Sequence, residues 1–201
     1  MITSKNRFIQ DCRKLVIVGD SMCGKTSLLL AFKDNQFIQT CNATISKTYA
    51  TDIQVDGQTI DLTLLDTAGL EDYSLCRQLS YPNAHVVIIC FNVISPISAR
   101  NVIDIWTPEI RHFCGQCPIV LVACKKDLRT DSQIIAKLKQ EGEKPVTNET
   151  GKRLATEIKA DVYMECSAKT REGVQDLFIQ AARLSLKNRS RRKSHRTCVL
   201  Y

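Results

Sequence analysis

A glycine-rich segment between two apolar runs carries residue types that bind phosphate. It consists of Gly19, Asp20, Ser21, Met22, Cys23, Gly24, Lys25, Thr26 and Ser27. From Gly19 to Thr26 it follows the pattern G-x-x-x-x-G-K-[ST], with a predicted strand before it and helical spacing after it. The two glycines allow a tight turn that points backbone N–H groups at an anion, and the helix adds its positive end. The pattern with its flanks predicts a phosphate-binding loop rather than a chance glycine-rich turn.

Side chains that could act on phosphate and magnesium are expected at two places. The Lys25 ammonium can reach the outer phosphates, and the Thr26 hydroxyl can hold a magnesium ion. Asp66 follows an apolar strand, where its carboxylate could hold magnesium through water, and Gly69 leaves room for a backbone N–H to contact a terminal phosphate. The tetrapeptide D-x-x-G is common by itself, but its position about forty residues beyond the loop makes the prediction specific.

Two further polar segments follow buried strands and suit a guanine base. Their residues are Cys124, Lys125, Asp127, Ser167, Ala168 and Lys169. The Asp127 carboxylate can accept hydrogen bonds from the ring N–H and the exocyclic amine of guanine, and adenine lacks that amine. The stems of Lys125 and Lys169 can cover the two base faces, and the Ala168 N–H can meet the guanine oxygen. The alternative is two charged loop ends on a solvated rim.

The elements that must position these residues alternate between strand and helix. Strands are expected at 13–18, 86–91, 119–124 and 162–166, with a hairpin at 51–65 around Asp56-Gly57. Helices are expected after the phosphate loop to about 33, and at 98–113, 131–140, 147–160 and 173–186, while 36–47 is expected to be a mobile loop. This order predicts a doubly wound α/β sheet with its ligand at the carboxyl ends of the strands.

Composition favours one soluble domain. The chain has 201 residues, 44% of them hydrophobic and 24% charged. No apolar run reaches the roughly 18 residues of a membrane span, and residues 1–12 lack the apolar core of a signal peptide, so we expect a cytosolic protein. Residues 187–201 carry six basic residues and no acidic one, whereas the rest has 22 basic and 21 acidic residues. The folded body is therefore not expected to bind nucleic acid.

The ten cysteines are expected to be reduced and packed mainly as small apolar residues. Cys114 and Cys117 have the C-x-x-C spacing of redox or metal sites. No second pair lies at the distance along the chain that a zinc site needs.

The motifs together make residues 13–186 resemble a small GTPase of the Ras superfamily, with the P-loop NTPase G domain as its fold. This resemblance implies a mostly parallel six-stranded sheet with one antiparallel strand, and a GTP/GDP switch with magnesium. The Rho branch is indicated by the segments 66–73, 79–82 and 106–109, and by the extra charged helix near 131–140. The resemblance also implies that Phe37 packs edge-on against guanine, and that Thr44 reaches magnesium only when a third phosphate is present.

Two departures from the family pattern concern hydrolysis. Leu70 stands where the family has a glutamine that positions the attacking water, and an alkyl side chain makes no hydrogen bond. Ser21 replaces a glycine, and its side chain crowds the space for the arginine finger of an activating protein. That finger accounts for about 10³–10⁵ in rate in this class. The resemblance therefore implies a protein that binds GTP, hydrolyses it slowly and stays mostly GTP-loaded.

Other departures concern nucleotide exchange and effectors. Cys124 replaces an asparagine of the guanine motif, as in some Rho relatives, and Cys41 and Ala43 replace a tyrosine and a proline of the first switch. These changes predict faster exchange and a less stiff loop. Ser46 and Lys47 stand where Rho proteins carry an aromatic residue and a glutamate that touch effectors, which predicts a different effector set.

The C-terminal residues resemble the prenylation box of the Rho branch. Cys198 is fourth from the end and follows the basic residues of 187–196. A prenyl group plus a basic patch predicts attachment to the cytoplasmic face of a membrane, the plasma membrane in particular. The alternatives are a solvated polar tail and a nuclear address. The resemblance further implies a monomer with effectors bound through 36–47 and 68–80, cytoskeletal or membrane effectors among them, with exchange factors and a prenyl-binding chaperone as partners.

Two other functions remain open at this point. One is a nucleotide-binding scaffold without a working GTPase cycle, which Ser21 and Leu70 fit equally well. The other is a P-loop kinase that uses ATP, against which Asp127 and the 167–169 loop argue. A comparison of effector binding in the GTP and GDP states distinguishes the scaffold from a GTP switch. Competition between guanine and adenine nucleotides distinguishes the kinase from a GTPase.

Overall fold

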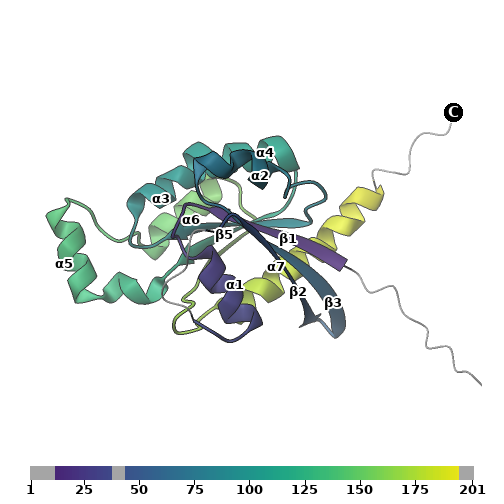
Figure 1. Ribbon diagram of the computed structural model, residues 1–201, viewed down its shortest axis with the longest axis horizontal. Helices are drawn as coiled ribbons and strands as arrows, with labels where there is room; N and C mark the ends of the chain where they lie inside the picture. The colour runs from purple at the N-terminus through teal and green to yellow at the C-terminus, as the bar shows by residue number, and fades with distance from the viewer. Residues whose placement is uncertain (1–11, 38–43, 195–201) are drawn as a thin grey trace, which may run out of the picture.

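A six-stranded sheet forms the centre of the computed structural model, which describes residues 12–37 and 44–194 (Figure 1). In order across the sheet the strands are β2 (Ser46–Val55), β3 (Gln58–Thr67), β1 (Cys12–Gly19), β4 (Val86–Asn92), β5 (Ile119–Cys124) and β6 (Val162–Glu165). Only the β2–β3 pair is antiparallel among them. The predicted doubly wound sheet with one antiparallel strand is confirmed.

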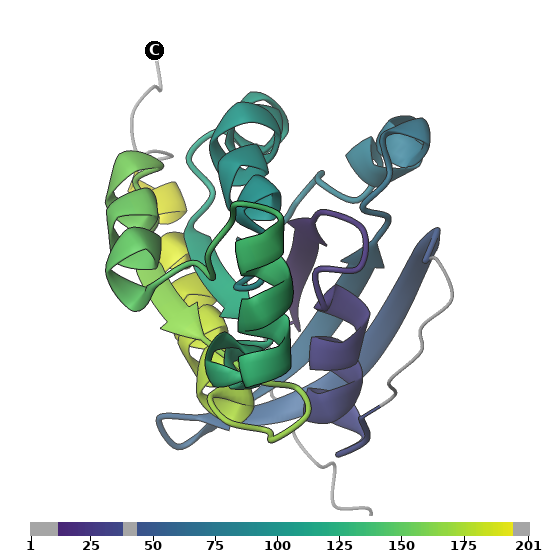
Figure 2. The same cartoon turned by 90° about the vertical axis from the view of Figure 1, so that its left-hand side faces the viewer.

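Helices cover both faces of this sheet. They are α1 (Lys25–Lys33), α2 (Ser74–Gln78), α3 (Pro96–Asn101), α4 (Thr107–Cys114), α5 (Ser132–Gln140), α6 (Asn148–Glu157) and α7 (Val174–Ser194). One buried cluster joins the sheet to α1 and α7, and a second joins the other face to the α3–α4 region and α6. Figures 1 and 2 show these two helical layers on opposite sides of the strands, with α5 standing off at one end.

The strands follow from their side-chain patterns. Every residue of β4 and β5 is buried, as expected for strands covered on both faces. The hairpin strands alternate instead, with Ile60, Leu62 and Leu64 facing the core. Asp56 and Gly57 connect them with φ of 49° and 79°, the left-handed values that a type I′ turn requires.

Several elements differ from the expected boundaries, among them α6, which ends at Glu157 rather than at 160. The hairpin runs from Ser46 to Thr67 rather than over 51–65. The helix expected at 98–113 starts at Pro96 and contains a π-helical turn, Val102–Trp106, before α4. The last helix continues past Leu186 to Ser194, because lysine and arginine are good helix formers and no proline or glycine stops it.

The helix expected at 131–140 is α5. Its first turn is capped by Asp131, whose side chain accepts hydrogen bonds from the backbone N–H groups of Gln133 and Ile134 at 2.9 and 3.1 Å. No helix within the described part of the chain is both long enough and apolar enough to span a bilayer. The expectations for residues 1–11, for Cys41 and for Cys198 lie outside the described residues.

Candidate nucleotide-binding site

A cavity of about 410 Å³ opens at the carboxyl ends of β1 and β5. It lies where a doubly wound sheet binds its ligand. The side chains and backbone that line it come from the phosphate loop and the start of α1, from Phe37 and Thr44, from the 67–70 segment, and from the loops after β5 and β6. They are Ser21, Met22, Gly24, Lys25, Thr26, Ser27, Leu28, Phe37, Thr44, Thr67, Gly69, Leu70, Cys124, Lys125, Asp127, Leu128, Ala168 and Lys169.

The phosphate loop turns tightly around the Lys25 ammonium. Lys25 Nζ donates to the carbonyl oxygens of Gly19 and Asp20, both at 2.7 Å. Gly19 has φ 138°, and a Cβ there would lie 2.1 Å from the Cys90 oxygen, so only glycine fits. Gly24 caps α1 with φ 115°. The loop thus aims a lysine and a helix N-terminus at the cavity, the arrangement that binds phosphate.

The residues expected to hold magnesium meet at one point. Thr26 Oγ1 donates to Asp66 Oδ2 at 2.6 Å and lies 2.9 Å from Thr44 Oγ1. Asp66 is fully buried, and burial raises its pKa, opposed by the Thr26 hydrogen bond and the Lys25 and Lys47 charges.

The donor set at this point fits a hard cation. Within the described residues, Asp66 Oδ1 is one of the few buried side-chain atoms without a hydrogen-bond partner. Two hydroxyls and a carboxylate with a spare oxygen suit magnesium, which prefers oxygen ligands. Among residues 12–37 and 44–194, no cluster of three or more His, Cys, Asp or Glu side chains could hold a metal ion.

The Asp20 side chain does not line the cavity and instead anchors the loop to the α3–α4 region. Its two carboxylate oxygens accept from Asn101 Nδ2 at 2.8 Å and from Trp106 Nε1 at 2.7 Å. Trp106 ends the π-helical turn, where the Thr107 hydroxyl also donates to the Val102 oxygen at 2.6 Å. The turn therefore presents the indole N–H to the loop, a local use of π-helical geometry that is frequent at functional sites.

Arg77 of α2 fixes the segment that follows Asp66. Its Nη1 donates to the carbonyl oxygens of Ala68 and Leu70 at 3.0 and 3.1 Å. Its Nε and Nη2 form a two-point ion pair with Glu109 at 2.7 and 2.9 Å, and its guanidinium lies 4.8 Å from the Trp106 ring centre. Tyr81 also donates to Glu109. Burial raises the pKa of Glu109, but Arg77 and Tyr81 hold it below its ordinary value.

The segment that carries Leu70 packs against the segment that carries Ser21, at the end of the cavity formed by the phosphate loop. A Cβ on Gly69 would come within 2.3 Å of the Ser21 nitrogen and 2.4 Å of the Asp20 carbonyl carbon, so the two backbones are in close contact. Leu70 is 40% exposed and lines the cavity. The cavity wall at this point is thus an alkyl side chain and a small hydroxyl.

At the base end, loops from β5 and β6 approach each other. Lys126 donates its backbone N–H to the Cys166 oxygen at 3.1 Å, and Lys125 takes the left-handed φ of 60°. This conformation lets Lys125, Asp127 and Lys169 line one cavity. The polar segments that follow β5 and β6 are therefore brought together, as the sequence predicts, although only β5 is fully buried and β6 is half-buried.

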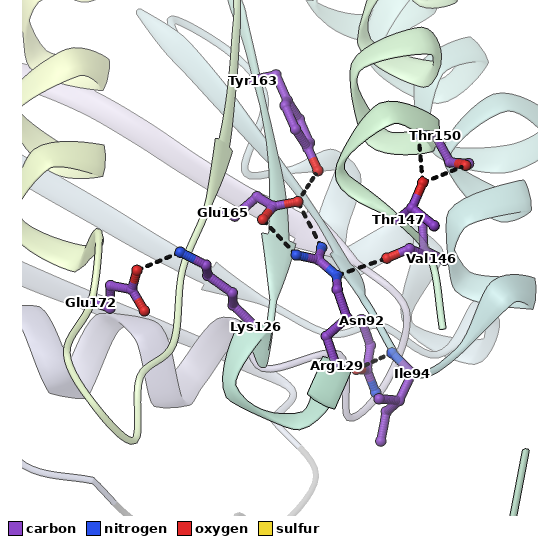
Figure 3. A network of polar contacts seen from close by, with 10 residues as sticks. All are labelled: Asn92, Ile94, Lys126, Arg129, Val146, Thr147, Thr150, Tyr163, Glu165 and Glu172. Atoms are coloured by element: carbon purple, nitrogen blue, oxygen red, sulfur yellow. Dashed lines mark hydrogen bonds and ion pairs between the residues drawn. The ribbon is translucent and has the colours of Figure 1, made fainter. Parts of the chain in front are cut away.

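Charged side chains connect the β5 loop to β6 and to the loop that follows it (Figure 3). Arg129 donates to both carboxylate oxygens of Glu165 at 2.6 and 2.7 Å and to the Val146 oxygen at 2.9 Å, and Tyr163 donates to Glu165 at 2.7 Å. Burial opposes ionisation of Glu165, but the Arg129 and Tyr163 hydrogen bonds lower its pKa to about 2. Lys126 also pairs with Glu172 across the two loops.

Five expected residues do not line the cavity. Gly19 and Asp20 offer carbonyls to Lys25, Cys23 is buried beneath the loop, Asp66 lies behind Thr26, and Ser167 is buried, where its hydroxyl accepts from the Thr170 N–H at 3.0 Å. Sequence reasoning missed the anchors Arg77, Glu109, Asn101, Arg129 and Glu165. The segment Trp106–Glu109 is typical of the Rho branch, and it is the one sequence signal for part of this set.

A doubly wound sheet whose cavity is lined by a phosphate loop of this form defines the class of P-loop nucleotide-binding proteins. The family model described as "Ras family" matches residues 14–187, and the chain belongs to that family.

Three curated yeast relatives define the branch. The chain is 50% identical over 179 residues to "GTP-binding protein RHO1" of Saccharomyces cerevisiae, an alignment that covers 89% of this chain and 86% of the relative. It is 46% identical to "GTP-binding protein RHO1" of Candida albicans, over 94% of this chain and 95% of the relative. It is 47% identical to "GTP-binding protein rho1" of Schizosaccharomyces pombe, over 94% and 96%. The protein is a Rho-family small GTPase.

Proposed function

We propose that this protein binds GTP and GDP with magnesium and hydrolyses GTP slowly, so that it is mostly GTP-loaded in cells. The observation that carries the proposal is that the phosphate loop and the loops after β5 and β6 line one cavity whose wall also includes Leu70. Leu70 is not needed for any nucleotide contact. Because it stands in place of a glutamine, the attacking water has no hydrogen-bonding side chain to orient it.

Each nucleotide-holding residue has a role that its position supports. Lys25 exchanges its weak 3.9 Å contact with Cys23 Sγ for a phosphate oxygen and keeps its two backbone carbonyls. Asp127 accepts from the guanine ring N–H and amine, and so selects against adenine. Lys125 and Lys169 cover the base faces with their stems.

Thr26, Thr44 and Asp66 supply the oxygens for magnesium. When bound, magnesium neutralises charge on the phosphate oxygens. Thr44 belongs to the segment just after residues 38–43, and its hydroxyl already lies at the Thr26 hydroxyl. We expect it to leave that position when the third phosphate is absent, which makes residues 36–47 sensitive to the nucleotide state.

Slow hydrolysis follows from two side chains. Leu70 neither donates to nor accepts from the attacking water. Ser21 lines the cavity and its backbone lies close to Gly69, and we expect its side chain to crowd the arginine finger of an activating protein. Unaided hydrolysis by Ras proceeds at about 10⁻⁴ s⁻¹, and we expect this protein to be no faster.

Nucleotide extracted from freshly purified protein tests the proposal. We expect guanine nucleotide with GTP in excess over GDP, and bound GTP that excess ATP does not displace. A content dominated by GDP contradicts slow hydrolysis, whereas displacement by ATP contradicts the assignment of Asp127. The two failures are thus read separately.

The signalling surfaces are part of the proposal. Residues 36–47 and 68–80 bind cytoskeletal or membrane effectors, and the departures at Ser46 and Lys47 change which effectors are bound. A prenyl group on Cys198 and the basic residues that precede it hold the monomer at the cytoplasmic face of the plasma membrane. Exchange factors and a prenyl-binding chaperone are the partners that complete such a cycle. Mass spectrometry of the cellular protein tests Cys198, and an unmodified cysteine contradicts the anchor.

A further inference from the structure

Two cysteines lie at opposite ends of one tight turn, far along the chain from the phosphate loop. Cys114 is the last residue of α4, and the Cys117 N–H donates to the Cys114 oxygen at 3.1 Å. Gly115 between them has φ 56° and ψ −116°, the values of the first central residue of a type II′ turn. A β-turn brings the Cα atoms of its end residues within about 7 Å, and disulfides join Cα atoms about 4.4–6.8 Å apart.

The side chains of the two cysteines converge on one neighbouring turn. Cys114 Sγ donates to the Tyr81 oxygen at 4.0 Å, and Cys117 Sγ donates to the Ala84 oxygen at 3.5 Å. Tyr81 and Ala84 are themselves the ends of a turn, since the Ala84 N–H donates to the Tyr81 oxygen at 3.0 Å. Both sulfur atoms therefore point the same way from the 114–117 turn, as a disulfide between them requires.

The 114–117 turn is held in place by a cationic side chain. Arg111 Nη1 donates to the carbonyl oxygens of Gly115 and Cys117 at 3.4 and 3.3 Å, and Nη2 donates to the Lys159 oxygen at 3.2 Å. The turn is thereby tied to the segment after α6. Its geometry is set before any bond between the sulfurs forms, which lowers the conformational cost of closing it.

We propose that Cys114 and Cys117 form a redox site, a dithiol that glutathione disulfide converts to an intramolecular disulfide. Cys114 is partly exposed, whereas Cys117 is only 2% exposed. Access therefore assigns the order of reaction: the oxidant meets Cys114 first, and Cys117 resolves the adduct.

The reaction balances with one glutathione disulfide. The Cys114 thiolate attacks one of its sulfur atoms, forming a mixed disulfide and releasing one glutathione thiolate. The Cys117 thiolate then attacks Cys114 Sγ and expels the second glutathione. Two protein thiols are oxidised, the glutathione disulfide is reduced to two glutathione thiols, and the two protons from the cysteines go to the leaving thiolates.

Closing this disulfide changes contacts near residues 68–80. The S–H groups that donate to Tyr81 and Ala84 are lost. Tyr81 stacks on Phe113 with ring centres 5.7 Å apart, and its hydroxyl donates to Glu109, which pairs with Arg77. The side chains of Tyr81 and Glu109 thus connect the redox site to Arg77, which fixes the Ala68 and Leu70 carbonyls.

Redox equilibration of the full chain, loaded with guanine nucleotide, tests the proposal. The protein is held in glutathione buffers of rising oxidised fraction, quenched with acid, alkylated and cleaved with chymotrypsin. Cleavage after Phe113 and Leu121 isolates residues 114–121, which contain Cys114 and Cys117 and no other cysteine. We expect this peptide to lose two hydrogens and to escape alkylation as the oxidised fraction rises. A doubly alkylated peptide or a lasting glutathione adduct overturns the proposal.

Two controls separate the turn geometry from general thiol reactivity. Exposed Cys76 has no cysteine within four residues of it and should stop at the glutathione adduct. In C117S, Cys114 should stop there as well. Wild-type protein unfolded in urea, which needs no variant to fold, should require about a tenfold higher oxidising ratio for half-closure. Half-closure at the same or a lower ratio in urea overturns the role of the turn.

Discussion

At the base end of the pocket, the loops after β5 and β6 are tied together by charged hydrogen bonds from Arg129 and Lys126. At the phosphate end, the wall beside the loop is Leu70 and Ser21, which offer one small hydroxyl between them. The segment carrying Leu70 is nevertheless held by Arg77 through its backbone carbonyls. At this end the backbone is held in place, but the side chain that it carries cannot make a hydrogen bond.

The difference supports the proposal that the chain keeps nucleotide binding and has lost fast hydrolysis. We expect retention of nucleotide to depend on the loops whose shape the Arg129–Glu165 pair supports. Hydrolysis depends on a side chain that can hydrogen-bond water, and the fixed position of the Leu70 carbonyl does not supply one. Binding and hydrolysis should therefore respond to different substitutions.

The largest expected effect comes from restoring the phosphate end. The double variant S21G/L70Q regains a water-orienting amide and opens space beside Gly69. We expect hydrolysis in the presence of a Rho-type activating domain to rise by about 10³-fold or more over wild type, measured in a single turnover. GTP affinity should stay unchanged, because neither side chain is needed to hold the nucleotide. A double variant that remains as slow as wild type argues against this explanation.

At the base end, the substitution E165Q removes the ion pair, because it leaves the Arg129 guanidinium without its carboxylate. Glu165 has a side chain only 9% exposed, so we expect a loss of about 3 kcal/mol in the free energy of unfolding, measured with urea. Glu172 is the matched control, since its ion pair with Lys126 also joins segments of the β5 and β6 region but its side chain is 58% exposed. E172Q should cost under about 0.5 kcal/mol. Equal losses for the two variants contradict the contrast.

The pH dependence of stability sharpens the same contrast. The pKa of Glu165 lies at about 2 in the folded protein and near 4.5 without its partners. Because the folded pKa is the lower one, its stabilising contribution is complete above about pH 4.5 and is lost as pH falls toward 2. Wild type should lose thermal stability more steeply than E165Q over this range. Parallel melting curves for the two proteins exclude the role given to this pair.

A smaller effect is expected at the effector edge, beyond the phosphate end. Lys47 pairs with Asp66 in the β2–β3 register and its side chain is exposed. K47E restores the negative charge that Rho proteins carry there, and we expect it to tighten binding to a Rho effector domain about tenfold, or ~1.4 kcal/mol. Titration of the GTP-loaded protein with such a domain measures it, and T48E provides a neighbouring charge control. Weaker binding of K47E contradicts the account of altered effectors.

Local motifs made much of the fold and site predictable. The phosphate loop, the Asp-Gly hairpin and the apolar strands β4 and β5 follow from spacing within a few residues. The sequence therefore predicted correctly which of them are loop, turn and strand. The extension of α7 to Ser194 was missed because its end was inferred from apolar positions, whereas helix propensity continues through the basic run.

The contacts that tie the site together could not be found in this way. Asp20 and Trp106 are 86 residues apart, and Arg129 and Glu165 are 36 apart. Such pairs depend on how separate elements pack against the sheet. The π-helical turn before α4 decides where the Trp106 N–H points, and helical spacing of apolar residues does not reveal it.

Single-turnover hydrolysis by the wild-type protein loaded with GTP and magnesium tests the central claim most directly, when measured with and without a Rho-type activating domain. Loss of the water-orienting group predicts a rate of about 10⁻⁴ s⁻¹ or slower, raised less than about tenfold by the domain. An acceleration of about 10³-fold or more by the activating domain would contradict it.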